Sequence, residues 1–178
     1  MPSITHIIRA GSTDAPTETI RTLHTELAAV GLPVSGTETS GTPRFETATA
    51  SRVKEFQKLH RLSETGDLDP VTGGVMSLSA LVATEQDRGR LRTALRAAEG
   101  QVSDAPLYNY WLARYAVMNR DFGLARRLRD RLGDIVVDLD DLVVAPDFPV
   151  PQKPEVPFPE NFYTYRYNLI SQGDITTL

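Results

Sequence analysis

Apolar residues recur at helical spacing in three successive stretches of the first half of the chain. The first stretch begins at residue 17 and stops at Gly31 and Pro33, which favour the end of a helix. The second follows Phe45, and the third follows Pro70, a residue tolerated at the first turn of a helix. The apolar positions are Ile20, Leu23, Leu27, Val30, Ala50, Val53, Phe56, Leu59, Val75, Met76, Leu78 and Leu81. This pattern predicts three amphipathic helices.

The next part of the chain predicts a connecting helix and a helical hairpin. Residues 85–101 are highly charged and place Leu91, Leu95 and Ala98 on one face, which is typical of a largely solvent-exposed helix. An aromatic helix runs from 106 to about 118, a break covers 119–122, and 123–132 are helical again. The hairpin resembles a single tetratricopeptide-like unit over about 106–132, in the order of its residues Leu112, Ala113, Asp121, Phe122, Ala125 and Leu128.

Both ends of the chain have patterns of extended backbone. Residues 3–9 hold a short apolar run typical of a strand. Residues 135–144 fit parts of a strand period and parts of a helix period, so both alternatives stay open. Six prolines then favour an extended course, because each lacks an amide donor: Pro146, Pro149, Pro151, Pro154, Pro157 and Pro159. The alternation over 162–170 predicts a final strand.

An ordered set of residues in the first half resembles the peptidoglycan-binding-like domain family. The family order is a leucine-rich helix ending in glycine, a loop aromatic, Val-x-x-Phe-Gln, Thr-Gly and Asp-Pro-x-Thr. The matching residues are Leu23, Leu27, Gly31, Phe45, Thr49, Val53, Phe56, Gln57, Leu62, Thr65, Gly66, Asp69, Pro70, Thr72 and Leu78. The resemblance covers about residues 17–81 and implies a small, non-catalytic three-helix module. Within it, Asp69 is predicted to cap the third helix.

Together these patterns predict a mainly α protein, in which the three-helix peptidoglycan-binding-like module is followed by the helical hairpin, with extended N- and C-terminal arms. The predicted units are an arm over 1–16, the module over 17–83, a helical extension over 84–145 and a proline-rich arm over 146–178. The aromatic residues of the extension are predicted to form a packed core: Tyr108, Tyr110, Trp111 and Tyr115. Its arginines are predicted to lie on a salt-bridged surface: Arg114, Arg120, Arg126, Arg127, Arg129 and Arg131.

The resemblance also implies a shallow ligand site at the loop and the start of the second helix. The candidate ligand-binding residues are Arg44, Phe45, Glu46, Thr49 and Arg52. Glu46 stands where the family usually has glycine, and Arg52 stands where it usually has alanine. Both side chains are bulky and charged, so they change the surface that would meet glycan or peptide.

The tyrosine-rich end of the chain suggests a second kind of site. An alternating strand on an extended arm is suited to joining the sheet of another protein, with backbone hydrogen bonds giving affinity and side chains filling pockets. The candidate partner-binding residues are Phe158, Phe162, Tyr163, Tyr165, Arg166, Tyr167 and Leu169. They predict protein partners in an assembly.

Composition and charge exclude several classes of partner. The net charge of -4 and the pI of 5.4 give no footprint for nucleic acid, which is held mainly by clustered basic residues. No apolar run approaches the roughly 20 residues of a membrane span. The first residues have no secretory signal pattern, so we expect a cytoplasmic or particle-associated assembly.

The candidate chemistry is sparse. His6, His24 and His60 occur singly, with no spacing of a metal site, and His60 is predicted to lie at a helix end or on the surface. The acidic cluster lacks the glycine turn and final glutamate of a calcium loop, which favours a solvated face: Asp134, Asp138, Asp140 and Asp141. No metal and no cofactor is predicted. No arrangement of nucleophile, base and orienting group stands out, so an enzyme is not expected.

Two functions follow from these expectations. The first is a non-catalytic structural or adaptor protein of a larger assembly, such as a toxin complex or a phage-like or contractile injection particle, anchored by its extended arms. The alternative is a peptidoglycan-binding module that brings an associated activity to the cell wall.

Overall fold

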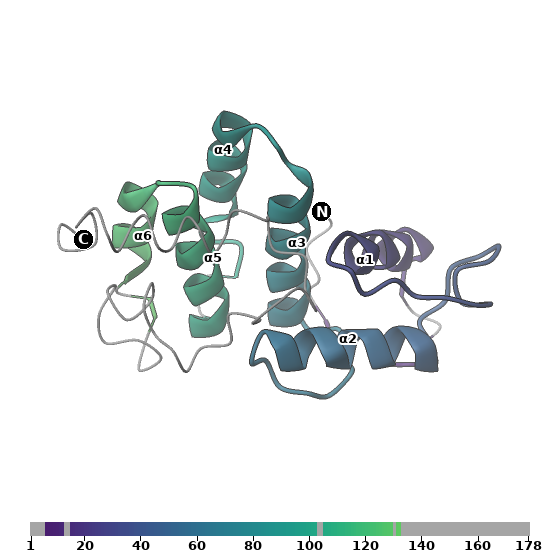
Figure 1. Cartoon of the computed structure of the whole chain (residues 1–178). Helices are drawn as coiled ribbons and strands as arrows, with labels where there is room; N and C mark the ends of the chain where they lie inside the picture. Colours follow the sequence, from purple (N-terminus) through teal and green to yellow (C-terminus); the bar gives the residue numbers. More distant parts are fainter. Residues whose placement is uncertain (1–5, 13–14, 103–104, 130, 133–178) are drawn as a thin grey trace.

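The computed structural model describes residues 6–12, 15–102, 105–129 and 131–132. Within these residues the chain is mainly α, as predicted, and the single β-bridge joins Ile8 to Leu68. The helices are α1 (Thr17–Ala29), α2 (Thr47–Leu59), α3 (Pro70–Thr84), α4 (Arg88–Ala98), α5 (Pro106–Met118) and α6 (Phe122–Arg129). Helix α3 stands at the centre, with α1 and α2 on one side and α4, α5 and α6 on the other (Figure 1).

Three of these helices end in the same hydrogen-bonded turn. After α1, α2 and α5, the backbone N–H groups of Leu32, Leu62 and Asp121 donate to carbonyls five residues earlier, at 2.8, 2.9 and 2.8 Å. The turns after α2 and α5 place Arg61 and Arg120 in the left-handed region, at φ 52° and 55°. This conformation costs a side-chain-bearing residue about 1–2 kcal/mol, so the surrounding contacts have to hold it.

Helix α6 begins at Phe122, one residue before the predicted start. Asp121 follows the turn that ends α5, and its carboxylate accepts the backbone N–H of Leu124 at 3.3 Å. A carboxylate in this position satisfies a free amide of the first turn and favours the positive end of the helix dipole. The predicted break over 119–122 is therefore one residue too long, because the cap residue is Asp121.

The residues that carry the family resemblance organise the turn between α2 and α3. The buried amide of Gln57 accepts the N–H of Gly66 at 2.8 Å and donates to the carbonyl of Asp67 at 2.9 Å. It also donates to the hydroxyl of Thr72 at 3.2 Å. Gly66 has a φ of +78°, and a Cβ there would lie 3.2 Å from the carbonyl oxygen of Ala50. Glycine is therefore required by both the backbone conformation and the close approach of α2.

The prediction that Asp69 caps the third helix is confirmed. Its carboxylate accepts the backbone N–H groups of Val71 and Thr72, both at 2.9 Å, while Pro70 occupies the first helical position. The hydroxyl of Thr72 donates to the same carboxylate at 2.6 Å. One acidic residue thus fixes the start of α3 and connects it to the Gln57 network.

Helix α5 packs directly on α3. A Cβ at Gly74 would lie 2.8 Å from the ring of Tyr108, so glycine allows the two helices to approach closely at this point. The Tyr108 hydroxyl crosses to α4 and donates to the carbonyl of Ala98 at 2.9 Å. The buried residues of the first three helices and of the extension consequently form one continuous hydrophobic core.

The predicted aromatic core of α5 is confirmed, and it surrounds a buried histidine. Trp111 is fully buried and donates its indole N–H to the carbonyl of His60 at 3.1 Å. The His60 ring stacks on Phe56, with 3.9 Å between centroids, and lies 4.5 Å from the Trp111 ring. Its Nε2 is 3.2 Å from the hydroxyl of Ser79, which is 2.8 Å from that of Tyr115. Polar and aromatic contacts thus join α2, α3 and α5.

One expectation about these residues is confirmed at a buried position, and another is wrong. His60 lies at a helix end, as predicted, but it is buried and not on the surface. Burial, together with the nearby charge of Arg114, lowers its pKa to about 3, although the hydrogen bond with the carbonyl of Phe56 opposes the shift. Arg114 is also buried, at 5 % exposure, and donates to the hydroxyl of Tyr110 at 2.6 Å. It therefore belongs to the aromatic core and not to the salt-bridged surface.

A carboxyl group buried between α1 and α3 should make the stability of the protein depend on pH. One oxygen of Glu26 is buried without a hydrogen-bond partner among the described residues. Burial raises its pKa from 4.5 to about 7, and a hydrogen bond with Ser77 opposes the shift. The folded pKa lies above the unfolded one, so this contribution to stability is complete below about pH 4.5 and is lost as the pH rises through 7.

We expect Glu26→Gln to increase the free energy of unfolding at pH 8 by about 2–3 kcal/mol, because the amide avoids burying a charge. The gain should shrink as the pH falls and disappear near pH 4.5. Urea unfolding across this range measures it. Glu18→Gln, which changes an exposed residue of the same helix, is the matched control. Parallel pH profiles for the wild-type chain and Glu26→Gln would contradict the expectation.

The described part of the N-terminal arm lies against the body of the protein. Ile8 pairs with Leu68 through two backbone hydrogen bonds of 3.0 and 2.9 Å, and the N–H of Gly11 donates to the carbonyl of Phe45 at 2.8 Å. Arg9 forms an ion pair with Asp67 at 3.4 Å. The arm therefore reaches both the turn before α3 and the loop before α2. The predicted elements over 135–144, 146–159 and 162–170 lie outside the described residues.

Candidate ligand-binding surface at the start of α2

The loop before α2 is fixed by one buried acidic side chain. The Glu38 carboxylate is only 6 % exposed and accepts the backbone N–H groups of Glu46, Ala48 and Thr49 at 3.1, 2.6 and 2.9 Å. It also accepts the hydroxyl of Thr49 at 2.6 Å. Burial would raise the pKa of Glu38, but these hydrogen bonds outweigh it and hold the pKa below its usual value. Glu38 therefore caps α2 as a carboxylate.

The same network reaches α1. The ring Nε2 of His24 lies 2.8 Å from the Thr49 hydroxyl. Burial lowers the pKa of His24, while the charge of Glu38 and a hydrogen bond with the backbone of Arg44 raise it. The backbone N–H of Arg44 in turn donates to the carbonyl of Glu38 at 3.0 Å. The loop is thus held to two helices, and it presents a fixed surface.

The five candidate ligand-binding residues divide into two groups. Phe45 and Thr49 are buried, at 1 % and 0 % exposure, so their side chains support the loop from within. The charged candidates, Arg44, Glu46 and Arg52, reach the surface. A ligand at this place would therefore contact the charged residues.

The exposed side chains form two ion pairs, one in the loop before α2 and one on α2 itself. Arg44 pairs with Glu46 at 3.1 Å, and Arg52 pairs with Glu55 at 2.7 Å. All four side chains are 41–53 % exposed, so water screens the pairs and each is worth little for stability. We call Arg44, Glu46, Arg52 and Glu55 the charged surface. Because Glu38 already occupies the amides at the start of α2, a ligand carboxylate would have to be bound by the two arginines.

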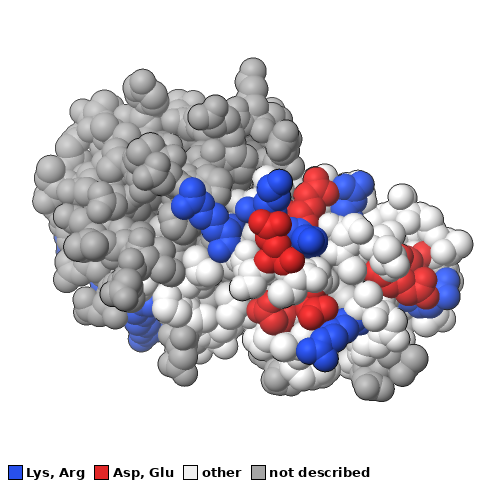
Figure 2. All heavy atoms as spheres, turned by 90° about the horizontal axis from the view of Figure 1, so that it is seen from below, with Lys and Arg blue, Asp and Glu red and all other residues white. Residues whose placement is uncertain are grey.

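Positive and negative groups alternate over the face that carries α2. Figure 2 views the molecule from below Figure 1 and shows basic and acidic side chains side by side, without a field of one sign. Such a face suits a ligand with both kinds of charge better than a uniform polyanion.

The candidate partner-binding residues of the tail lie outside the described part of the chain: Phe158, Phe162, Tyr163, Tyr165, Arg166, Tyr167 and Leu169. Among the residues that are described, no group of three or more metal-ligating side chains comes together. No described helix has both the length and the apolar surface to cross a membrane.

Sequence patterns missed Glu38, although it determines the shape of the surface. Glu38 stands eight residues before the residue that precedes α2, whereas local capping motifs place the acidic residue within the first turn. Its partners are known only once the loop has folded back on the helix, so the sequence offered no local signal for it.

Comparison with known families agrees with the geometry of the first three helices. Residues 16–76 match the family model described as "Putative peptidoglycan binding domain", which covers α1, α2 and the start of α3. Neither the curated proteins nor the solved structures gave a match to the chain. The tetratricopeptide-like resemblance of the hairpin stays a prediction. Residues 16–76 thus match a putative peptidoglycan binding domain, within a longer chain whose described part is mainly helical.

Proposed function

We propose that this protein binds peptidoglycan without cleaving it, through the charged surface at the start of α2. The observation that carries the proposal is the family match over residues 16–76, the same residues that build the fixed loop and this surface. The stem peptides of peptidoglycan bear free carboxylate and amino groups. Arg44 and Arg52 are suited to the carboxylates, since a guanidinium donates paired hydrogen bonds, and Glu46 and Glu55 are suited to the amines.

The position of Phe45 argues for the peptide part of the polymer over the sugar rings. Protein sites that stack on a flat ligand surface use an exposed aromatic ring, whereas the Phe45 ring is buried beneath the loop. The accessible groups of the charged surface are guanidinium and carboxylate groups. We therefore infer that recognition is polar and depends on salt concentration.

The binding of purified sacculi by the full-length protein tests the proposal. We expect the double variant Arg44→Ala, Arg52→Ala to bind with at least about tenfold lower affinity, because it loses charge-assisted hydrogen bonds to the ligand. The matched control is Arg21→Ala with Arg90→Ala, which removes two exposed, ion-paired arginines elsewhere. Equal affinity of the two double variants would refute the assigned surface. Failure of the wild-type protein to bind would refute the function itself.

A second role, as an adaptor within a protein assembly, rests on the tail sequence and on one feature of the fold. The loop before α2 and helix α6 lie at opposite ends of the molecule (Figure 1). The chain that follows α6 therefore starts away from a cell-wall ligand at α2. If this role is correct, deletion of residues 149–178 should release the protein from the assembly while leaving its helical circular dichroism unchanged.

A further inference from the structure

Formal charge is distributed unevenly along the chain. Residues 88–132 contain ten arginines, no lysine and four acidic residues. Residues 133–178 contain eight acidic residues and two basic ones. The first segment therefore has an excess of six positive charges, and the second an excess of six negative charges. The modest net charge of the whole chain conceals this opposition.

The arginines of the first segment gather on α4, on α6 and on the turns beside these helices. Eight of them are exposed: Arg88, Arg90, Arg92, Arg96, Arg120, Arg126, Arg127 and Arg131. We call this set the arginine surface. Four carboxylates lie among the same elements: Glu85, Asp87, Glu99 and Asp121. The described surface consequently keeps an excess of positive charge even after its local partners are counted.

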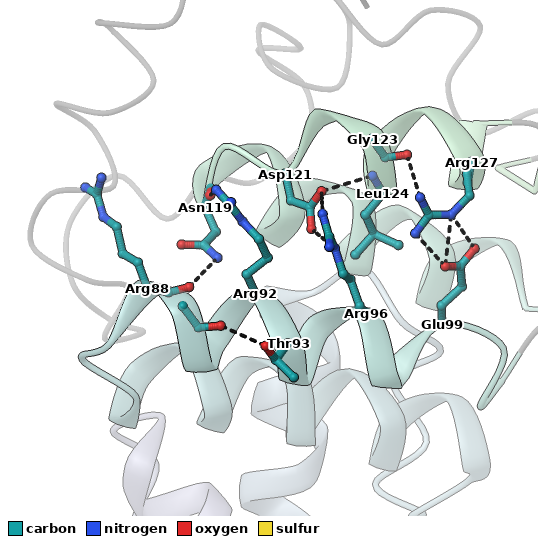
Figure 3. Close-up of polar contacts among 11 residues, drawn as sticks. Arg88, Arg92, Thr93, Arg96, Glu99, Asn119, Asp121, Gly123, Leu124 and Arg127 are labelled. Atoms are coloured by element: carbon teal, nitrogen blue, oxygen red, sulfur yellow. Dashed lines mark hydrogen bonds and ion pairs between the residues drawn. The ribbon is translucent and has the colours of Figure 1, made fainter.

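Contacts across the helices show how the local carboxylates are used (Figure 3). Arg96 binds the buried carboxylate of Asp121 through two hydrogen bonds of 2.6 and 3.0 Å. Arg127 binds Glu99 at 2.9 Å, and Arg131 lies 3.9 Å from the same carboxylate. Asp121 and Glu99 thus connect α4 to α6, and the arginines of the surface lie on the elements that these two carboxylates join.

Helix α4 presents its arginines in a row. Arg88, Arg92 and Arg96 are spaced four residues apart and lie along the side of α4 that faces the turn between α5 and α6 (Figure 3). Arg92 donates one hydrogen bond of 3.3 Å to the carbonyl of Asn119, whose amide donates to the carbonyl of Arg88 at 3.2 Å. A guanidinium has five N–H donors, so one contact of this kind leaves donors for a carboxylate.

We propose that the arginine surface is a docking surface for the acidic segment 134–141 of the same chain. This segment begins two residues after Leu132 and holds Asp134, Asp138, Asp140 and Asp141. A short connection gives it a high effective concentration at α4 and α6. Arginine also suits carboxylate partners better than lysine does, because its planar fork donates paired hydrogen bonds. This docking does not depend on peptidoglycan binding.

Docking would determine where the rest of the chain leaves the body. The proline-rich sequence starts at Pro146, five residues after the end of the acidic segment. If that segment is held on α4 and α6, the proline-rich sequence starts at the end of the molecule opposite the loop before α2 (Figure 1). The arginine surface then serves to position a partner-binding tail.

Energy transfer between two dyes on the full-length chain tests this docking. The chain has no native cysteine, so dyes attach only at the two introduced cysteines. These are Thr93→Cys, at an exposed position of α4, and Val144→Cys, beyond the acidic segment. An undocked connection of twelve residues samples separations up to about 40 Å, whereas a docked segment is held at one short separation, so a dye pair with a Förster radius of about 20 Å gives higher transfer for docked chains. We expect high transfer at low salt, falling by at least about half in 1 M NaCl, where charges are screened beyond about 3 Å.

Neutral variants assign the effect to the acidic segment. Asp138→Asn, Asp140→Asn and Asp141→Asn together should lower the transfer at low salt to the high-salt level. The control, Glu155→Gln, Glu160→Gln and Asp174→Asn, removes the same charge and should leave the transfer high. Equal transfer in the two triple variants would overturn the proposal. Energy transfer between singly labelled chains mixed together would show that the segment docks on a second copy, and this result would also overturn the proposal. A third contradicting result would be inorganic polyphosphate that binds the arginine surface with the same affinity in the wild-type protein and in the variant that lacks the three aspartates.

Discussion

Trp111→Ala should lower the free energy of unfolding by about 3–5 kcal/mol, as expected when a large, fully buried aromatic side chain is removed. Trp111 packs from α5 against His60 at the end of α2, and its indole N–H is the hydrogen-bond partner of the His60 carbonyl. The substitution therefore opens a cavity and leaves a buried carbonyl without this donor. Since the core is continuous, both halves of the described chain should lose stability.

Urea unfolding followed by far-ultraviolet circular dichroism measures this effect without relying on tryptophan fluorescence. Trp111→Phe keeps most of the apolar volume and removes the hydrogen bond, so we expect an intermediate loss of about 1–3 kcal/mol. We also expect a single transition for the wild-type protein. A loss below about 1 kcal/mol for Trp111→Ala, or two separate transitions in the wild-type protein, would show that α5 is not integral to the core.

Gln57→Ala should also lower the free energy of unfolding by about 3–5 kcal/mol. The Gln57 side chain is fully buried and connects Gly66, Asp67 and Thr72 at the turn before α3. Alanine leaves several of these polar groups without their partner, and each unsatisfied group costs about 1–3 kcal/mol. The truncation also leaves a cavity beside α2.

Amide hydrogen exchange identifies the residues that Gln57→Ala destabilises. In Gln57→Ala, exchange should become faster first at Gly66, whose N–H donates to the Gln57 side chain. The neighbouring exposed residue Lys58 gives a matched control, because Lys58→Ala changes the same helix without disturbing the turn. If Gln57→Ala and Lys58→Ala proved equally stable, the turn would not depend on this network.

The helices could be predicted from the sequence because their signals are local. Apolar residues at Ile20, Leu23 and Leu27 mark the buried face of α1, and Asp69 before Pro70 marks the start of α3. The family motif also gave the three-helix module, since residues such as Gln57 and Gly66 act over one short turn. These features depend on neighbours that are close along the chain.

The features that escaped prediction depend on residues that are distant along the chain. Arg114 lies in the core, where it donates a hydrogen bond to Tyr110 and packs against the surrounding rings. An arginine on a helix usually lies at the surface instead. His60 is buried because Trp111, 51 residues later, covers it. The role of Glu38 likewise depends on how the loop folds back. None of these contacts follows from local periodicity.

The position of the candidate surface is a prediction from the sequence, and the structure adds which of its side chains are buried and which reach solvent. Its position at the loop and the start of α2 came from the family resemblance. The structure then separates Phe45 and Thr49, which support the loop, from Arg44, Glu46 and Arg52, which reach solvent. Residues that fit a family motif are thus mainly structural here, whereas the residues that depart from it, Glu46 and Arg52, provide much of the accessible chemistry.

The most direct test of the central claim is to incubate the full-length protein with purified sacculi and analyse both the pellet and the supernatant. Binding without cleavage predicts that the protein sediments with the sacculi in a saturable manner at moderate salt, while no muropeptides appear in the supernatant. Protein that stays in the supernatant at every salt concentration, or muropeptides that accumulate with time, would contradict the claim.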